Sequence, residues 1–123
     1  MKRVTFLAVF LLTVFTCVLA QSQRGGQRMT VEERAKRTTE WMKEELNLTT
    51  EQIAPVDSIN LLFAKAQQII FQSSDGDREK IRETMEALEN EKVLSLSEVL
   101  TEEQIELYKE KVKEMTNNRR RNT

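Results

Sequence analysis

Between residues 30 and 116 the chain contains one glycine, Gly76, and one proline, Pro55, and Glu, Lys, Leu and Ile dominate the rest. Glu, Lys and Leu have high helix propensity, whereas glycine and proline are the residues that interrupt helices. No stretch of useful length alternates apolar and polar residues as a half-buried strand does. This region is therefore predicted to be all-α.

Capping signals divide the region into four helices. Thr30-Val31-Glu32-Glu33 is a capping box that begins the first helix, and Asn47 is a suitable stop. Thr49 is the predicted N-cap of the second helix, and Thr101 that of the fourth. Because Thr49 follows Asn47 so closely, we expect the first two helices to be joined by a very short connection.

The second and third helices are predicted to form an antiparallel hairpin. Ser73-Ser74-Asp75-Gly76 is a typical turn sequence, and Asp75 or Asp77 is positioned to cap the third helix. We expect Pro55 to bend or loosen the start of the second helix without ending it. On the third helix the stem of Lys92 fills a gap in the apolar stripe. The sequence leaves open whether the third helix breaks near Ser95.

The N-terminus has the layout of an export signal. Lys2 and Arg3 precede an apolar stretch that runs from Val4 to Leu19 and is short for a membrane span. We expect residues 1–20 to be a cleaved signal peptide and the protein to be periplasmic. Acylation of Cys17 is the disfavoured alternative, because Val14-Phe15-Thr16 is a poor lipobox. Residues 21–29 are predicted to be a flexible leader, residues 30–116 a single helical domain, and residues 117–123 a basic, disordered tail.

Composition narrows the chemistry that the chain can perform. It contains no histidine, and its one cysteine, Cys17, lies in the predicted signal peptide. A histidine-dependent nucleophile is therefore excluded, and the usual ligands of zinc and copper are missing. Removal of residues 1–20 leaves a net charge of −3, with basic and acidic residues mixed along every helix. We expect no enzyme activity, cofactor, metal or nucleic-acid partner.

Two helix starts repeat one motif. Leu48-Thr49-Thr50-Glu51-Gln52-Ile53 and Leu100-Thr101-Glu102-Glu103-Gln104-Ile105 both read Leu-Thr-x-x-Gln and differ only at the third position. With the export signal, the size and the lack of disulfides, the chain resembles the periplasmic LTxxQ family, which includes the Spy and CpxP proteins. The capping residues of the two motifs, which we expect to start helices rather than to bind a ligand, are Leu48, Thr49, Gln52, Leu100, Thr101 and Gln104.

The resemblance implies a thin, curved layer of four helices in antiparallel hairpins, assembled as a homodimer. It also implies an ATP-independent chaperone, a holdase that binds unfolded or misfolded envelope proteins in the stress response. The alternatives are a regulatory partner of an envelope-stress sensor kinase and a structural envelope protein. The chain departs from the best-studied members in two respects: its net charge is negative, and Pro55 lies inside the second predicted helix.

The candidate client or dimer surface lies on the first two helices. A thin helical layer leaves apolar side chains without a core to enter, and exposed apolar patches commonly mark interaction sites. The predicted surface residues are Trp41, Met42, Ile59, Leu62, Phe63, Ile69 and Ile70. A weaker prediction is contact of Arg119, Arg120 and Arg121 with an anionic membrane surface.

Overall fold

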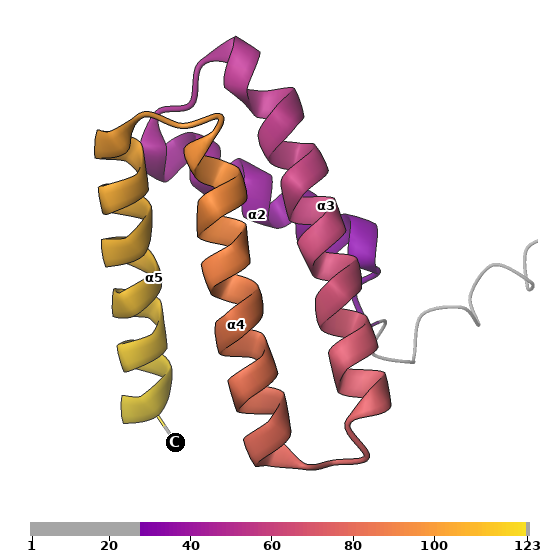
Figure 1. Ribbon diagram of the computed structural model, residues 1–123. Coiled ribbons are helices and arrows are strands. Elements are labelled where there is room, and N and C mark those ends of the chain that lie inside the picture. The colour runs from indigo at the N-terminus through magenta and orange to yellow at the C-terminus, as the bar shows by residue number, and fades with distance from the viewer. Residues whose placement is uncertain (1–27, 123) are drawn as a thin grey trace, which may run out of the picture.

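The computed structural model describes residues 28–122 (Figure 1), and most of these residues are helical. The helices are α2 (Val31–Leu46), α3 (Thr50–Ser73), α4 (Arg78–Ser97) and α5 (Glu102–Arg121). The described residues contain no strand. The predicted all-α fold is confirmed, and the predicted signal peptide and most of the leader lie outside the described residues.

All four helices begin where the capping signals predict, and α2 ends where they predict. Thr30 Oγ1 accepts the Glu33 N–H at 3.1 Å, and Glu33 Oε2 accepts the Thr30 N–H at 2.8 Å, which completes the first capping box. Asn47 adopts a left-handed conformation with φ 51° at the end of α2. Asp77 accepts hydrogen bonds from two amides of the first turn of α4. These are local interactions, so the sequence alone could indicate them.

α3 and α4 form the predicted antiparallel hairpin (Figure 1). The turn between them reverses the chain through Asp75 at φ 47° and Gly76 at φ 80°, and Gly76 tolerates this angle because it has no Cβ. α3 continues through Pro55, and α4 runs without a break past Ser95 to Ser97. Lys92 is only 7% exposed, as predicted for a stem that fills the apolar stripe.

Three helices lie side by side and the fourth crosses them. Figure 1 shows α3, α4 and α5 as neighbours in a layer, with α2 lying across one face of it. The core is therefore sandwiched between α2 and the layer, near the end where α3 and α5 begin. Its buried cluster contains Met42, Leu46, Val56, Leu96, Leu100, Ile105 and Tyr108.

Polar contacts fix the crossing of α2 and α3. The Thr39 hydroxyl lies 2.9 Å from Asp57 Oδ1 and accepts a hydrogen bond from Asn60 Nδ2 at 3.0 Å. Thr39 and Asn60 are both buried, so these bonds offset the cost of removing polar groups from water. Between α2 and α5, Lys111 pairs with Glu45 at 3.0 Å.

The basic segment at the C-terminal end is more ordered than the sequence suggested. α5 extends through Arg121, so the prediction of disorder is wrong for residues 117–121. The segment lacks an apolar stripe, which is why it resembled a frayed tail. However, three arginines in the last turn interact favourably with the negative end of the helix dipole. Within residues 28–122, no helix has both the length and the apolar character that a membrane span requires.

Candidate functional site

The two Leu-Thr-x-x-Gln motifs are joined by their glutamines, which we call the glutamine pair. Gln52 Nε2 lies 2.8 Å from Gln104 Oε1, and Gln104 Nε2 lies 3.1 Å from Gln52 Oε1. The two carboxamides therefore bond head to tail in both directions. Although the motifs are far apart in sequence, they form one structural unit at the start of α3 and α5.

The remaining hydrogen-bonding groups of the glutamine pair are used as well. Gln52 Nε2 also donates to the Val99 carbonyl at 3.2 Å, and Gln104 Nε2 to the Leu46 carbonyl at 3.1 Å. Each Oε1 accepts the N–H of its own N-cap, Thr49 or Thr101, at 3.0 Å. Each glutamine thus caps its own helix and also binds the segment that precedes the other motif.

The apolar residues of the motifs close the core beneath the glutamine pair. Leu100 and Ile105 belong to the buried cluster, and Leu48 is half-buried against it. The motifs therefore cap helices α3 and α5, as the sequence predicts. The contact between the two motifs was not predicted. The sequence signal for that contact was the repetition itself, because both copies keep glutamine at the third helical position, where a lone cap also accepts glutamate.

Two of the seven predicted surface residues are buried, which corrects that prediction. Met42 is fully buried and Phe63 is 6% exposed. Met42 shares the face of α2 that carries Thr39 and Leu46, and its Sδ lies 3.4 Å from Asn60 Nδ2. These side chains are covered by the crossing of α2 over α3, a long-range contact that periodicity alone does not reveal.

The other five predicted surface residues retain accessible area. Leu62 is 64% exposed and Ile69 63% exposed, whereas Trp41, Ile59 and Ile70 are half-buried. Leu94, which was not among the predicted residues, is 69% exposed. We call Leu62, Ile69 and Leu94 the apolar face.

Helical geometry places the apolar face on the side of the layer away from α2. Leu62 lies between the buried residues Asn60 and Ala64, and residues two positions apart point to nearly opposite sides of a helix. Ile69 follows Leu62 by seven residues and so shares its side. On α4, Leu94 lies in the same way between the buried Lys92 and Leu96.

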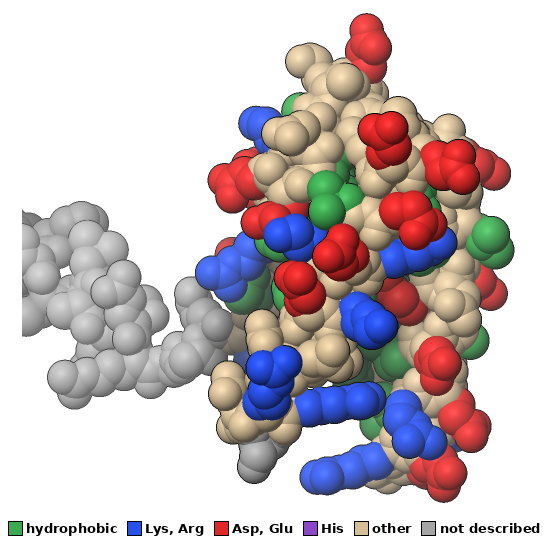
Figure 2. Space-filling view, turned by 90° about the vertical axis from the view of Figure 1, so that its left-hand side faces the viewer, with side chains coloured by type: hydrophobic (Ala, Val, Ile, Leu, Met, Phe, Trp, Pro, Cys, Tyr) green, Lys and Arg blue, Asp and Glu red, His purple; other side chains and the backbone are tan. Residues whose placement is uncertain are grey.

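A second surface feature is a groove of about 640 Å³ formed by residues from all four described helices. We call it the cationic groove; it is lined by Arg34, Arg37, Trp41, Lys92, Tyr108 and Met115, among others. Four of its lining residues are basic and one, Glu89, is acidic. Figure 2 shows Lys and Arg side chains gathered in the lower half of the view, with hydrophobic side chains visible between them.

The inner wall of the cationic groove is an electrostatic cluster. Tyr108 Oη donates a hydrogen bond to Glu89 Oε1 at 2.7 Å, and the Trp41 ring meets the Tyr108 ring edge-on at a centroid distance of 6.2 Å. Lys92 Nζ lies 5.8 Å from the centroid of the same tyrosine ring. Burial lowers the pKa of Lys92, and the nearby Glu89 carboxylate only partly opposes this shift.

Burial and the Glu89 carboxylate both raise the pKa of Tyr108, so its hydroxyl stays protonated as a donor. Among the described residues, no three acidic, cysteine or histidine side chains form a group able to hold a metal ion. The groove therefore presents cationic nitrogens and one carboxylate, that of Glu89, next to aromatic and aliphatic walls.

Comparison with known proteins gives one match. The family described as "Domain of unknown function (DUF4890)" matches residues 20–108, which is most of the chain. No curated protein and no solved structure matches.

Proposed function

The chain belongs to the DUF4890 family, and because that family has no assigned function we propose from the geometry that it is a binding protein without enzyme activity. In this proposal it acts as a chaperone-like holdase. It binds unfolded or misfolded envelope proteins on the apolar face. The observation that carries the proposal is the exposure of Leu62, Ile69 and Leu94 on the folded helices α3 and α4.

The apolar face is suited to this role because it is accessible in the folded protein. Its three side chains are each more than 60% exposed, so they offer apolar area without any local unfolding. An unfolded client exposes apolar segments whose burial releases about 25 cal/mol per Å². A surface that is exposed in the folded protein can bind such segments and release them without an energy source.

The finer identity of the protein is part of the proposal. The paired Leu-Thr-x-x-Gln motifs support a relationship to the LTxxQ proteins, since both copies are used in one structural unit. That relationship in turn supports export to the periplasm and a homodimer. A dimer formed through the apolar face would hide that face from clients, so the oligomeric state has to be measured alongside binding.

Light scattering tests the holdase proposal. The protein, purified from cells that express the full chain, is added in several-fold excess to a chemically unfolded model client. We expect it to suppress aggregation, and we expect the variant Leu62→Ser/Ile69→Ser/Leu94→Ser to lose most of that suppression. Sedimentation velocity on the same samples reports whether the substitutions also change the mass of the assembly.

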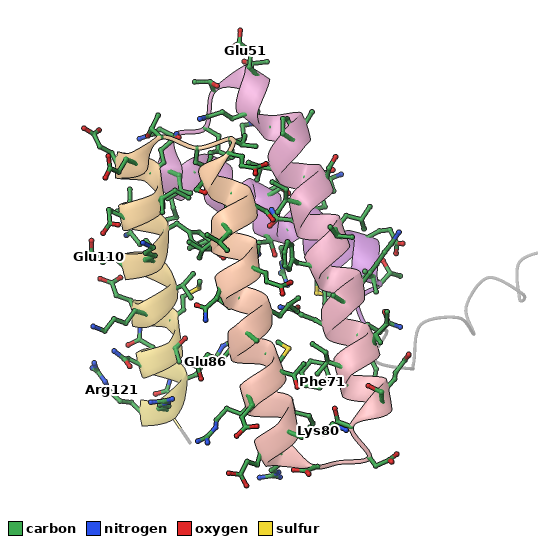
Figure 3. All side chains as sticks on the ribbon, viewed as in Figure 1. Glu51, Phe71, Lys80, Glu86, Glu110 and Arg121 are labelled. Atoms are coloured by element: carbon green, nitrogen blue, oxygen red, sulfur yellow. The ribbon has the colours of Figure 1, made fainter. Side chains whose placement is uncertain are left out.

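The matched control replaces exposed apolar residues that lie outside the apolar face. Phe71 is 54% exposed and Met115 40% exposed, and Figure 3 shows Phe71 near the end of α3 that adjoins the turn. The variant Phe71→Ser/Met115→Ser should keep full suppression. Equal suppression by the apolar-face variant and the wild type, or no suppression by the wild type, would show that this face does not hold clients.

A further inference from the structure

We infer that the cationic groove is a binding site for a small organic carboxylate with an apolar tail, a ligand of the fatty-acid type. The site is distinct from the apolar face and independent of the proposed holdase activity. Two independent features of the groove support a ligand. These are basic nitrogens that lack hydrogen-bond partners and an apolar wall directly beside them.

Lys92 is the first group without a partner. Its residue is only 7% exposed, yet its ammonium makes no hydrogen bond and no ion pair with any residue of the described part of the chain. The ammonium lies over the Tyr108 ring, 5.8 Å from its centroid. A buried charge without such a partner is costly, and a carboxylate in the groove would supply one.

Arg34 is the second unsatisfied group. Its Nε is buried and has no hydrogen-bond partner within residues 28–122, and Arg34 lines the same groove as Lys92. A guanidinium presents donors in a fixed fork that matches the two oxygens of a carboxylate. Arg34 and Lys92 belong to α2 and α4, so an anion between them would be held from two sides of the groove.

The apolar side chains that line the groove indicate that the part of the ligand next to the carboxylate is apolar. Trp41, Val112 and Met115 line it with aromatic and aliphatic surface. The volume of about 640 Å³ lies in the range of small-molecule sites, which combine apolar walls with a few charged or polar groups. An inorganic anion would leave these walls empty, whereas an aliphatic tail of several carbons would cover them.

Trp41 provides the assay because it is the only tryptophan in the chain and lines the groove. The purified protein is titrated with sodium decanoate below its micellar concentration while Trp41 emission is followed. We expect a saturable change. 1-Decanol, which has the same tail without the charge, should bind at least tenfold more weakly, and acetate, which has the charge without the tail, should give no change over the same range.

Substitutions locate the site. Lys92→Met keeps the length of the side chain and removes the ammonium, and it should weaken decanoate binding about tenfold or more, as expected for loss of one charge-assisted contact. The matched control is Lys80→Met, which removes the same charge from an exposed residue beside the α3–α4 turn (Figure 3). It should leave decanoate affinity unchanged.

The apolar-face variant Leu62→Ser/Ile69→Ser/Leu94→Ser separates this inference from the holdase proposal, because it should bind decanoate as the wild type does. Equal affinity for decanoate and decanol would overturn the carboxylate assignment. Wild-type affinity in Lys92→Met, measured on a variant whose far-ultraviolet circular dichroism is unchanged, would overturn the location.

Discussion

Replacement of Gln104 with glutamate distinguishes the two roles of the glutamine pair. As a cap, glutamate is as good as glutamine, and Glu33 performs that role at the start of α2 in this chain. Glutamate cannot replace glutamine in the pair, because a carboxylate has no N–H group with which to donate a hydrogen bond. The substitution therefore keeps the cap of α5 and removes the link between the motifs.

The structure sets the expected magnitude. Gln104→Glu removes the bonds that Nε2 donates to the Leu46 carbonyl and to Gln52 Oε1. Two lost hydrogen bonds cost about 1–3 kcal/mol, and the charged oxygen that replaces Nε2 also faces two carbonyl oxygens. A carboxylate in the first turn of a helix returns only about 0.3–1 kcal/mol. We therefore expect a decrease of about 2 kcal/mol in the free energy of unfolding.

Urea unfolding followed by circular dichroism at 222 nm measures this change at pH 7. The control is Glu33→Gln, the reverse substitution in a capping box whose side chain bonds only its own N-cap; it should change stability by less than about 0.5 kcal/mol. The loss in Gln104→Glu should shrink near pH 4, where a protonated carboxyl group regains one donor. A Gln104→Glu protein as stable as the wild type at pH 7 would refute the pairing argument.

Four further substitutions, one of them a control, test the core, the hairpin and the buried lysine. Met42→Ala should lower the free energy of unfolding by about 2–5 kcal/mol in urea, whereas Leu62→Ala, at an exposed site, should change it by less than about 0.5 kcal/mol. Asp77→Ala removes the cap of α4 and should cost about 1 kcal/mol in the same assay. Burial lowers the pKa of Lys92 in the folded protein below its ordinary value of 10.5. Between these two pKa values the unfolded chain binds more protons than the folded protein does. The stability of the wild type should therefore rise with pH in that window. Lys92→Met should be more stable at pH 7 and should lack this rise. The urea titrations stop at pH 9, one unit below the ordinary pKa of tyrosine, because at higher pH ionisation of Tyr108 in the unfolded chain destabilises the fold.

Much of the fold could be predicted because its determinants are local. Thr30, Asn47 and Thr101 each act within one turn of a helix, and their residue types are those that the local backbone geometry requires. The turn at Gly76 is local in the same sense. The burial of Lys92 was also predictable, since its neighbours at helical spacing are apolar and its long stem can lie along them.

The site was less predictable because its determinants are contacts between distant segments. A hydrophobic stripe on α3 shows that side chains will be buried, but not which of them α2 will cover. Phe63 is covered and Leu62, its neighbour, is not. The glutamine pair depends in the same way on two helix starts meeting in space, and the cationic groove depends on residues from four helices.

The distribution of the core connects the glutamine pair to the proposed activity. Along α3 no apolar residue after Ala64 is buried, and along α4 no residue before Lys92 is buried, so the half of the hairpin near the turn contributes little to the core. The stability of the fold is therefore concentrated at the end where the glutamine pair joins α3 to α5. Leu62 and Leu94 lie beside buried residues and are held rigidly, whereas Ile69 lies on the half that few tertiary contacts restrain. A client surface built in this way has a fixed part, which needs no ordering when a client binds, and an adaptable part, which can follow clients of different shapes.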